Sequence, residues 1–349
     1  MRPGAYSRRL RSDLSSRRPL SRLPRLLLAG VLLLGAAATG CAHPARAGDA
    51  PAPAPAGVAA PAFWVDPQSA AARQVGAWRR QGRAAQARLV GRIAWRPQAV
   101  WLNKEGAGNV VRGSLDAAAR ARRTVVFAAY FIPHRDCGAY SSGGARDARQ
   151  YRRWIDGIAR GLGTRSAYVI VEPDAVAHLV AGCPGVNARE RYALLAYAVQ
   201  RLERQPRTRV YLDAGNASWI PDERRLLGPL RRAGIGRADG FALNVSNYQT
   251  NRASSDYGHR LAKGLGGRKH FVVDSSRNGN GPYRGAQAWC NPPGRALGTP
   301  PTARTGDPSL DAYLWIKRPG ESDGTCRGGP RAGQWWPQYA LGLASRARG

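Results

Sequence analysis

The sequence predicts an α/β protein, a distorted and incomplete TIM-like barrel of about seven parallel strands with surrounding helices. Three observations carry this prediction. Short apolar runs of strand length recur along the chain, helix-like segments lie between most of them, and six of the runs end in acidic or amide side chains. Alternating strands and helices are typical of parallel β/α packing, and such barrels place functional side chains at the carboxyl ends of their strands. Seven strands fit an incomplete barrel better than a regular eightfold one.

The expected elements follow the apolar runs and the segments between them. Short runs rich in β-branched and aromatic residues indicate strands, and the longer segments between them indicate helices. The expected strands are Ala99–Leu102, Thr124–Ile132, Ala167–Val171, Arg209–Leu212, Gly240–Val245, His270–Val273 and Ala312–Ile316. The expected helices are Leu115–Arg123, Arg149–Leu162, Ala188–Gln205, Asp222–Ala233, Asp256–Leu265 and Gln334–Arg346.

Polar side chains at the predicted strand ends are the most informative feature of the chain. An unpaired carboxylate is costly to bury, so carboxylates that recur at the ends of buried strands are expected to share one polar site. Any one of them alone has an alternative explanation, as a helix cap or as the partner of an arginine. Their recurrence favours an enzyme that works with carboxylates. The polar residues at or just beyond the predicted strand ends are Asp136, Glu172, Asp174, Asp213, Asn244, Asn247, Asp274, Lys317, Glu321 and Asp323.

Asp174 is the strongest candidate for a general acid. It follows the apolar run Tyr168–Val171 and the dipeptide Glu172-Pro173. Loss of solvation at the end of a buried strand raises the pKa of a carboxyl group. A raised pKa keeps the carboxyl protonated near neutral pH, as a general acid requires. Asp136 and Asp323 are expected to be its charged neighbours.

Aromatic side chains are numerous, with ten Trp and thirteen Tyr. Trp101, Trp219 and Trp289 lie near predicted strand ends or in loops. Flat rings of this kind stack on the apolar faces of sugars and would line a polysaccharide cleft. Each ring taken singly has core packing as an equal alternative.

The N-terminal segment is predicted to direct export. Residues 1–40 carry eight Arg and one Asp, then the apolar stretch Leu26–Leu34 and small residues before Cys41, which is the order of a signal peptide. The apolar stretch is too short to span a bilayer comfortably. Ala38–Cys41 resembles a bacterial lipobox, which predicts acylation of Cys41, membrane anchoring and a cell-surface or extracellular location. Plain secretion and a twin-arginine signal are the alternatives. Residues 41–62 form an Ala/Pro-rich spacer, and residues 63–349 form the catalytic domain.

The chain is strongly basic, with a formal net charge of +32. Only four of its 54 basic residues are Lys, so the bias indicates a GC-rich genome as much as a function. A basic surface binds nucleic acid or anionic wall polymers without specificity. The arginines are scattered and form no dense run, so no specific nucleic-acid partner is expected.

Cysteines and histidines point to disulfides and not to a metal site. Besides Cys41, four Cys remain, and an even number in an exported domain predicts two disulfides, with free buried thiols as the alternative. The five His show no paired ligand spacing and the Cys spacing fits no zinc site. The sequence also contains neither G-x-S-x-G nor a P-loop, and no cofactor is expected.

Taken together, the motifs resemble glycoside hydrolase family 6, the inverting β-1,4-glucanases. The resemblance runs from about Phe63 to the last predicted helix, and its blocks are specific as an ordered series although each is weak alone. The blocks are RDCG at 135–138, SGG at 142–144, VEPD at 171–174, LDAG at 212–215, NVSNY at 244–248, DSSRNG at 274–279, WC at 289–290 and KRPGESDG at 317–324.

The resemblance implies roles for the matched residues. Asp174 looks like the general acid, and Asp136 like the carboxylate that tunes its pKa and relays a proton from water. Asp323 looks like the candidate base, and Tyr130, six residues before Asp136, like the residue that helps distort the sugar. The matched substrate-binding positions are Trp101, Asn103, Asn216, Trp219, Asn247, Trp289, Lys317 and Glu321. The implied disulfides are Cys137–Cys183 and Cys290–Cys326.

One position departs from the family pattern. The family usually has His after Asp-Ala-Gly, where this chain has Asn216, which can form hydrogen bonds but carries no charge. The rim segments are short, which predicts an open cleft and internal cleavage. The expected partner is a soluble or amorphous β-1,4-glucan, bound by a monomer. A cellobiohydrolase of the same family and a wall-associated carbohydrate-binding protein with little activity are the alternatives.

Overall fold

The computed structural model describes residues 62–348. The predicted signal segment, Cys41 and all but the last residue of the spacer lie outside the described residues. The described part of the chain contains seven strands in one sheet, ordered β1 to β7, and every neighbouring pair is parallel. The predicted fold is therefore confirmed as a curled, incomplete barrel. The strands are β1 Val100–Leu102, β2 Val125–Ala129, β3 Ala167–Val171, β4 Thr208–Asp213, β5 Gly240–Leu243, β6 His270–Asp274 and β7 Leu310–Leu314.

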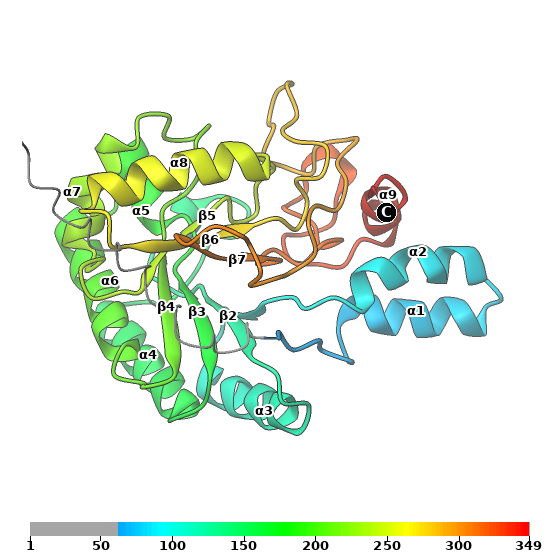
Figure 1. Ribbon diagram of the computed structural model, residues 1–349, viewed down its shortest axis with the longest axis horizontal. Coiled ribbons are helices and arrows are strands. Elements are labelled where there is room, and N and C mark those ends of the chain that lie inside the picture. The colour runs from blue at the N-terminus through cyan, green and yellow to red at the C-terminus, as the bar shows by residue number, and fades with distance from the viewer. Residues whose placement is uncertain (1–61, 349) are drawn as a thin grey trace, which may run out of the picture. The chain divides into compact units, whose positions relative to one another are not determined.

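The helices surround the sheet (Figure 1). Within residues 62–348 they are α1 Ala70–Arg80, α2 Ala84–Ala94, α3 Ala107–Arg120, α4 Ala148–Leu162, α5 Ala175–Ala181, α6 Ala188–Leu202, α7 Arg224–Arg232, α8 Asn251–Gly264 and α9 Pro337–Ser345. Helices α3, α4, α6, α7 and α8 cover the outer face of the sheet, whereas α1, α2 and α9 pack together in a separate apolar cluster. None of these helices is long and apolar enough to cross a membrane.

Side chains alternate between the two faces of each strand. In β2, Val125 and Phe127 join the large core under the helices, whereas Val126 and Ala128 point into the barrel with Tyr168. This period of two is the geometry of a β-strand, and because both faces are buried the strand is apolar throughout. Such strands leave only their ends for polar side chains.

The barrel remains open between β1 and β7, and two hydrogen bonds cross the gap. No strand ladder joins these two strands in the described part of the chain. Instead, the Ala99 N–H donates to the Trp315 carbonyl across 3.0 Å. The indole N–H of Trp101 donates to the Ile316 carbonyl across 2.8 Å. Trp101 therefore stands at the junction where the barrel nearly closes.

Several predicted elements differ in extent from the observed ones. The strand expected to reach Ile132 ends at Ala129, because the Phe131 and Ile132 N–H groups donate to the Glu172 carboxylate and not to a neighbouring strand. The last strand lies two residues earlier than expected and includes Asp311, whose carboxylate accepts from the Tyr211 hydroxyl across 2.6 Å. Helices α1, α2 and α5 were not expected, and α3 and α8 begin before their expected starts.

Candidate active site

The strand-end polar residues fall into two groups. Glu172, Asn244 and Asp274 are fully buried and turn inward to bind backbone groups. The Asp274 carboxylate, for example, accepts from the backbone N–H groups of Ser246, Ser276 and Lys317 and so joins the ends of three strands. These residues are structural connections. Asp136, Asp174 and Asp323 form the second group, which lies beyond the strand ends and is less completely buried.

Asp174 lies at the start of α5 in a left-handed backbone conformation, with φ of 71°. Its carboxylate does not cap the helix, so it stays available to a ligand. Burial raises the pKa of Asp174 well above its usual range, and the negative charge of Asp213 raises it further, followed by that of Asp136. Lys317 and a hydrogen bond from the Tyr130 hydroxyl act in the opposite direction without outweighing burial. The predicted protonated acid is consistent with this environment.

Asp213, at the end of β4, is a second carboxyl that contacts the backbone of Asp174. Its Oδ2 accepts from the Asp174 N–H across 2.8 Å and from the Gly215 N–H across 3.1 Å. Its Oδ1 is buried and has no hydrogen-bond partner among the described residues. Burial raises the pKa of Asp213 to about 7, against the two backbone donors that lower it. Asp213 was expected at a strand end, but no role was predicted for it.

Asp136 follows β2 and lies six residues after Tyr130 in the chain. Its Oδ2 accepts from the Ser141 N–H across 2.7 Å. Burial raises the pKa of Asp136, while the Ser141 N–H and the Arg135 guanidinium lower it. The carboxyl is half-buried, so it is able to meet both water and the acid beside it.

Tyr130 is buried between the rim carboxyls and Trp101. Its ring meets the Trp101 ring edge-on at 5.3 Å, and the Arg135 guanidinium lies 4.7 Å from its centroid on the other side. Burial raises the pKa of Tyr130 well above its usual range, and the charges of Asp174 and then Asp136 raise it further. Its hydroxyl therefore keeps its proton beside Asp174.

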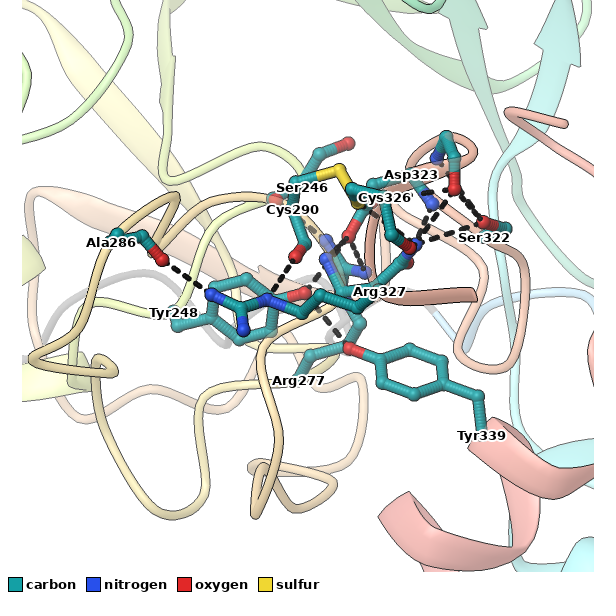
Figure 2. Close-up of a disulfide and its surroundings, with 12 residues drawn as sticks. Ser246, Tyr248, Arg277, Ala286, Cys290, Ser322, Asp323, Cys326, Arg327 and Tyr339 are labelled. Carbon is teal, nitrogen blue, oxygen red and sulfur yellow. Dashed lines mark hydrogen bonds and ion pairs between the residues drawn. A yellow bond between two sulfur atoms is a disulfide. The ribbon is translucent and has the colours of Figure 1, made fainter. Parts of the chain in front are cut away.

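Asp323 lies in a cage of donors (Figure 2). Its Oδ2 accepts from Arg277 Nη1 across 2.8 Å, from the Tyr248 hydroxyl across 3.0 Å and from the Asn291 N–H across 3.0 Å. Lys317 Nζ lies 3.3 Å from Oδ1. Burial alone would raise the pKa of Asp323, but the charges of Arg277 and Lys317 outweigh it and lower the pKa. Asp323 is therefore ionised.

The donors around Asp323 were largely missed by sequence reasoning. Arg277 and Tyr248 lie inside blocks of the family pattern, yet a motif match does not tell which side chains meet. Arg277 is fully buried, and an unpaired guanidinium would be too costly to bury there. A buried arginine in a strand-end block was the available signal for a carboxylate partner. Glu321, a predicted binding residue, is itself buried and pairs with Arg318 at 2.8 Å.

Three tryptophans expected in a cleft lie at different positions on the rim. Trp101 is at the barrel junction, Trp219 follows β4, and Trp289 precedes Cys290 and is 46% exposed. Asn216 Oδ1 accepts from the backbone N–H groups of Ser218 and Trp219 and so fixes the turn that carries Trp219. The residue that departs from the family pattern thus orients an aromatic ring.

The two other predicted amides also take part in local structure. The exposed Asn103 lies beyond β1, and its carbonyl accepts from Arg135 across 3.4 Å. Asn247 is half-buried, and its Oδ1 accepts from the Tyr248 N–H across 2.9 Å. Both disulfides implied by the family resemblance are present, Cys137–Cys183 and Cys290–Cys326, with Cα atoms 5.8 Å and 6.3 Å apart. Each fixes a loop that carries a rim carboxylate, Asp136 in the first and Asp323 in the second.

A carboxyl with a raised pKa and a carboxyl with a lowered pKa lie beyond the strand ends of a parallel barrel. The half-buried Trp101 and Trp219 and the exposed Trp289 lie at or beyond the strand ends of the same barrel. This combination is typical of a glycoside hydrolase. Among residues 62–348, no group of three or more His, Cys, Asp or Glu is arranged to hold a metal ion. The chain belongs to glycosyl hydrolases family 6, whose family model matches residues 58–347. The resemblance inferred from the motifs is thereby confirmed.

Named relatives support this membership. Endoglucanase A of Cellulomonas fimi is 43% identical over 290 residues, which cover 82% of this chain and 61% of that protein. Endoglucanase 1 of Streptomyces halstedii is 42% identical over 289 residues, covering 80% of this chain and 87% of that protein. The endoglucanase Cel6 of Mycobacterium tuberculosis, solved with methyl-cellobiosyl-4-deoxy-4-thio-β-D-cellobioside, superposes with a TM-score of 0.76. It is 44% identical, and the match covers 82% of this chain and 98% of that one.

Proposed function

We propose that this chain is an endo-β-1,4-glucanase that hydrolyses internal bonds of cellulose or related glucans with inversion. The single observation that carries the proposal is the Asp174 carboxyl, whose pKa is raised by burial and by Asp213 at the carboxyl end of the strands. The endoglucanase names of the relatives support a β-1,4-glucan as the polymer. Because the chain spans 61% of the Cellulomonas protein, the activity of that whole protein is carried over here only as a proposal.

In the proposed reaction, Asp174 gives its proton to the glycosidic oxygen as the bond to the sugar breaks. General acid catalysis of this kind contributes roughly 10²–10⁴-fold. Tyr130, whose neutral hydroxyl lies beside Asp174, is proposed to help hold the sugar in a distorted form. Burial keeps the acid protonated, and the negative charges of Asp213 and then Asp136 add to this effect.

Water attacks from the opposite face of the sugar. An inverting site requires acid and base carboxyls roughly 6.5–9.5 Å apart. We assign the base to Asp323, since its two cations keep it ionised while Asp174 stays protonated. Environments that push the pKa values of two carboxyls apart are the usual sign of an acid and a base. Asp136, with its half-buried carboxyl, is the proposed relay of a proton from water.

Substrate binding is assigned to the rim aromatics and the polar groups near them. Trp101, Trp219 and Trp289 are proposed to stack on successive sugar faces, with hydroxyl contacts from Asn103, Asn216, Asn247, Lys317 and Glu321. The proposal includes export, anchoring through an acylated Cys41, and action as a monomer. Export is tested by protease treatment of intact cells, acylation by mass spectrometry of Cys41, and the monomeric state by gel filtration.

A chain-end cellobiohydrolase is the second candidate, because the two rims of the site touch at Tyr140 and Trp289. Incubation with carboxymethylcellulose distinguishes the two activities. An endoglucanase lowers the viscosity quickly while producing few reducing ends, whereas cellobiose release at nearly constant viscosity indicates chain-end action. NMR of the first product should show the α-anomer, and a β-anomer contradicts inversion. Binding without any product would instead identify a carbohydrate-binding protein.

A further inference from the structure

The described chain enters the domain at the amino-terminal end of the barrel. Phe63 pairs with Thr124 in a parallel bridge, directly before β2 begins. The Thr124 N–H donates to the Ala62 carbonyl across 3.0 Å, and the Trp64 N–H donates to the Thr124 carbonyl across 2.9 Å. The segment that connects the domain to Cys41 therefore joins the barrel at the end opposite the proposed catalytic carboxyls.

This end of the barrel is more basic than the chain as a whole. Five connections lead from the outer helices α3, α4, α6, α7 and α8 into the strands β2 to β6. Their 25 residues include eight basic side chains and two acids, a net charge of +6, whereas the whole chain carries +32 over 349 residues. Positive charge is thus more than twice as dense here, which the general abundance of arginine does not explain. The connections are residues 121–124, 163–166, 203–207, 233–239 and 265–269.

Six exposed arginines of these connections form the basic face. They are Arg122, Arg123, Arg204, Arg207, Arg237 and Arg268. None of them takes part in an ion pair within residues 62–348. A cation in the last turn of a helix stabilises the helix dipole, but the effect is confined to that turn. These arginines lie beyond the last turns, so their charge remains available to a partner.

The two acids of the connections are occupied by backbone groups. Glu203 Oε1 accepts from the Asp239 N–H across 3.1 Å. Asp239 Oδ2 accepts from the Val210 N–H across 2.8 Å. Both carboxylates are therefore held by the protein itself and do not pair with the arginines of the basic face.

An open cavity lies in the basic face at the amino ends of β4 to β7. Its volume is about 430 Å³, and Arg237 and Arg268 line it together with Arg209, Lys269 and His270. The two carboxylates in its wall are Asp239 and Asp311, and Asp311 Oδ1 lies 2.9 Å from His270 Nδ1. Guanidinium groups match the geometry of phosphate oxygens with paired hydrogen bonds. The cavity thus offers several cations to one phosphate group.

We propose that the basic face is a docking surface for the phosphate headgroups of an anionic membrane, and that docking turns the end of the barrel with Asp174 away from the bilayer. The inference rests on the proposed anchoring through Cys41 and adds an orientation to it. Residues 41–61 can span at most roughly 70 Å, so an anchored domain stays close to the lipid. The end where this connection joins is also the basic one, which favours the membrane over a soluble polyanion as the partner. Anionic lipids attract arginines within about a Debye length of the surface.

The first test measures docking without the acyl group. The chain from residue 41 with Cys41→Ser is mixed with phosphatidylglycerol vesicles and, separately, with phosphatidylcholine vesicles. Sedimentation should show binding to phosphatidylglycerol alone at about 0.1 M salt, and release at about 0.5 M salt, where screening is stronger. Failure to bind phosphatidylglycerol overturns the proposal, as does equal binding to both lipids. Binding of soluble polyphosphate without binding of vesicles also overturns it and assigns the face to a soluble polyanion.

Two triple variants with the same change in net charge locate the binding. Each arginine near an anionic surface contributes a factor of roughly five to the binding constant. Loss of three arginines from the basic face should therefore weaken binding roughly 10²-fold, in the variant Arg207→Gln/Arg237→Gln/Arg268→Gln. The control removes three exposed arginines near the carboxyl ends of the strands and should change binding by less than about threefold. This control is Arg149→Gln/Arg284→Gln/Arg331→Gln. Equal weakening in the two variants shows an effect of net charge alone and overturns the docking face.

A second measurement tests the orientation. Protein bound to phosphatidylglycerol vesicles should hydrolyse hydroxyethylcellulose, an uncharged glucan, within about twofold of its rate in solution. Strong inhibition on vesicles, with full activity in solution, shows that the active site faces the lipid and overturns the orientation. If the free protein cleaves no glucan, the proposed glucanase function fails while the two triple variants still test the docking face. If Cys41 carries no acyl group in cells, anchoring fails while the unacylated chain still reports docking.

Discussion

The backbone N–H of Asp174 donates to the carboxylate of Asp213 across 2.8 Å, so the proposed acid is joined to a fully buried carboxyl on the neighbouring strand. The bond fixes the left-handed turn at Asp174 and places a second acidic group against the first. Two neighbouring carboxyls resist double ionisation, and the proton is held by the pair over a wider pH range than by an isolated Asp. Asp213 thereby adds to the effect of burial in raising the pKa of the proposed acid.

Replacing Asp213 by Asn should shift the pH profile of activity. Asn keeps the acceptor for the Asp174 N–H but removes the negative charge that raises the pKa of Asp174. The acid then loses its proton at lower pH, so the alkaline limb of kcat/KM should move to lower pH by roughly one to two units. Asp222→Asn, which changes an exposed carboxylate paired with Arg224, is the matched control and should leave the profile in place. An unchanged alkaline limb in Asp213→Asn would contradict the proposed role.

Replacing Asp174 by Asn should remove the proton donor and preserve the shape of the site. Turnover of cellulose should fall by roughly 10²–10⁴-fold, the usual contribution of general acid catalysis. An aryl cellobioside with a good leaving group needs less protonation and should be affected much less. Oligosaccharide binding, measured by calorimetry, should stay near that of the parent. Equal losses on both substrates would indicate a role in binding and not in proton donation.

Azide should distinguish the base from the relay. In Asp323→Ala the small anion can take the place of the attacking water, and its charge suits a site that holds Arg277 and Lys317. We expect partial recovery of activity and an α-glycosyl azide as product, which NMR identifies. Asp136→Ala should not be rescued in this way. Rescue of Asp136→Ala alone, with Asp323→Ala folded by circular dichroism yet inactive, would assign the base to Asp136.

Removal of the Cys290–Cys326 disulfide should destabilise the domain. The bridged residues are 36 positions apart. A disulfide that closes a loop of this size adds about 4 kcal/mol to the free energy of unfolding in the chain-entropy model. The double variant Cys290→Ser/Cys326→Ser should therefore unfold at lower urea concentration, as followed by far-UV circular dichroism. Peptide mapping under non-reducing conditions should recover Cys137 with Cys183. A Cys137–Cys290 peptide would contradict the observed pairing.

Glu172 should make stability depend on pH. Burial raises its pKa from 4.5 to about 7, although backbone donors lower it. As the pH rises from about 4.5, the unfolded chain releases this proton before the folded one does, so stability falls until about pH 7 and stays low above it. The decrease amounts to about 3 kcal/mol at 1.36 kcal/mol per unit. Glu172→Gln cannot ionise, so its stability relative to the parent should rise over this interval. If the free energy of unfolding of Glu172→Gln differs from that of the parent by the same amount at every pH, this role is excluded.

Strand patterns and ordered motifs sufficed to predict the sheet and the main rim carboxyls. All seven predicted strands overlap observed ones, because strands buried on both faces leave clear apolar runs. Helices α1 and α2 were missed, since they lie before the repeating pattern and their polar faces carry many Arg residues. Their apolar side chains pack against each other and against the distant helix α9, a partner that local periodicity does not reveal.

Pairings across the rim were harder to predict than the residues themselves. Asp213 was visible as a strand end, but its bond to the Asp174 N–H depends on the left-handed turn at Asp174. The contact of Tyr140 with Gly324 joins residues 184 positions apart and depends on the absence of a Cβ. Periodicity reports which side chains are buried, whereas these contacts depend on loop geometry.

We expect the cage around the proposed base Asp323 to form late in folding. Tyr248, Arg277, Asn291 and Lys317 follow β5, β6 and β7 in turn, so their donors meet only after the last third of the chain has docked. A nascent or half-refolded chain therefore has strands and helices but no paired cation–carboxylate centre. Recovery of hydrolysis after dilution from denaturant should lag behind recovery of circular dichroism. Activity is therefore expected only after the whole domain has folded.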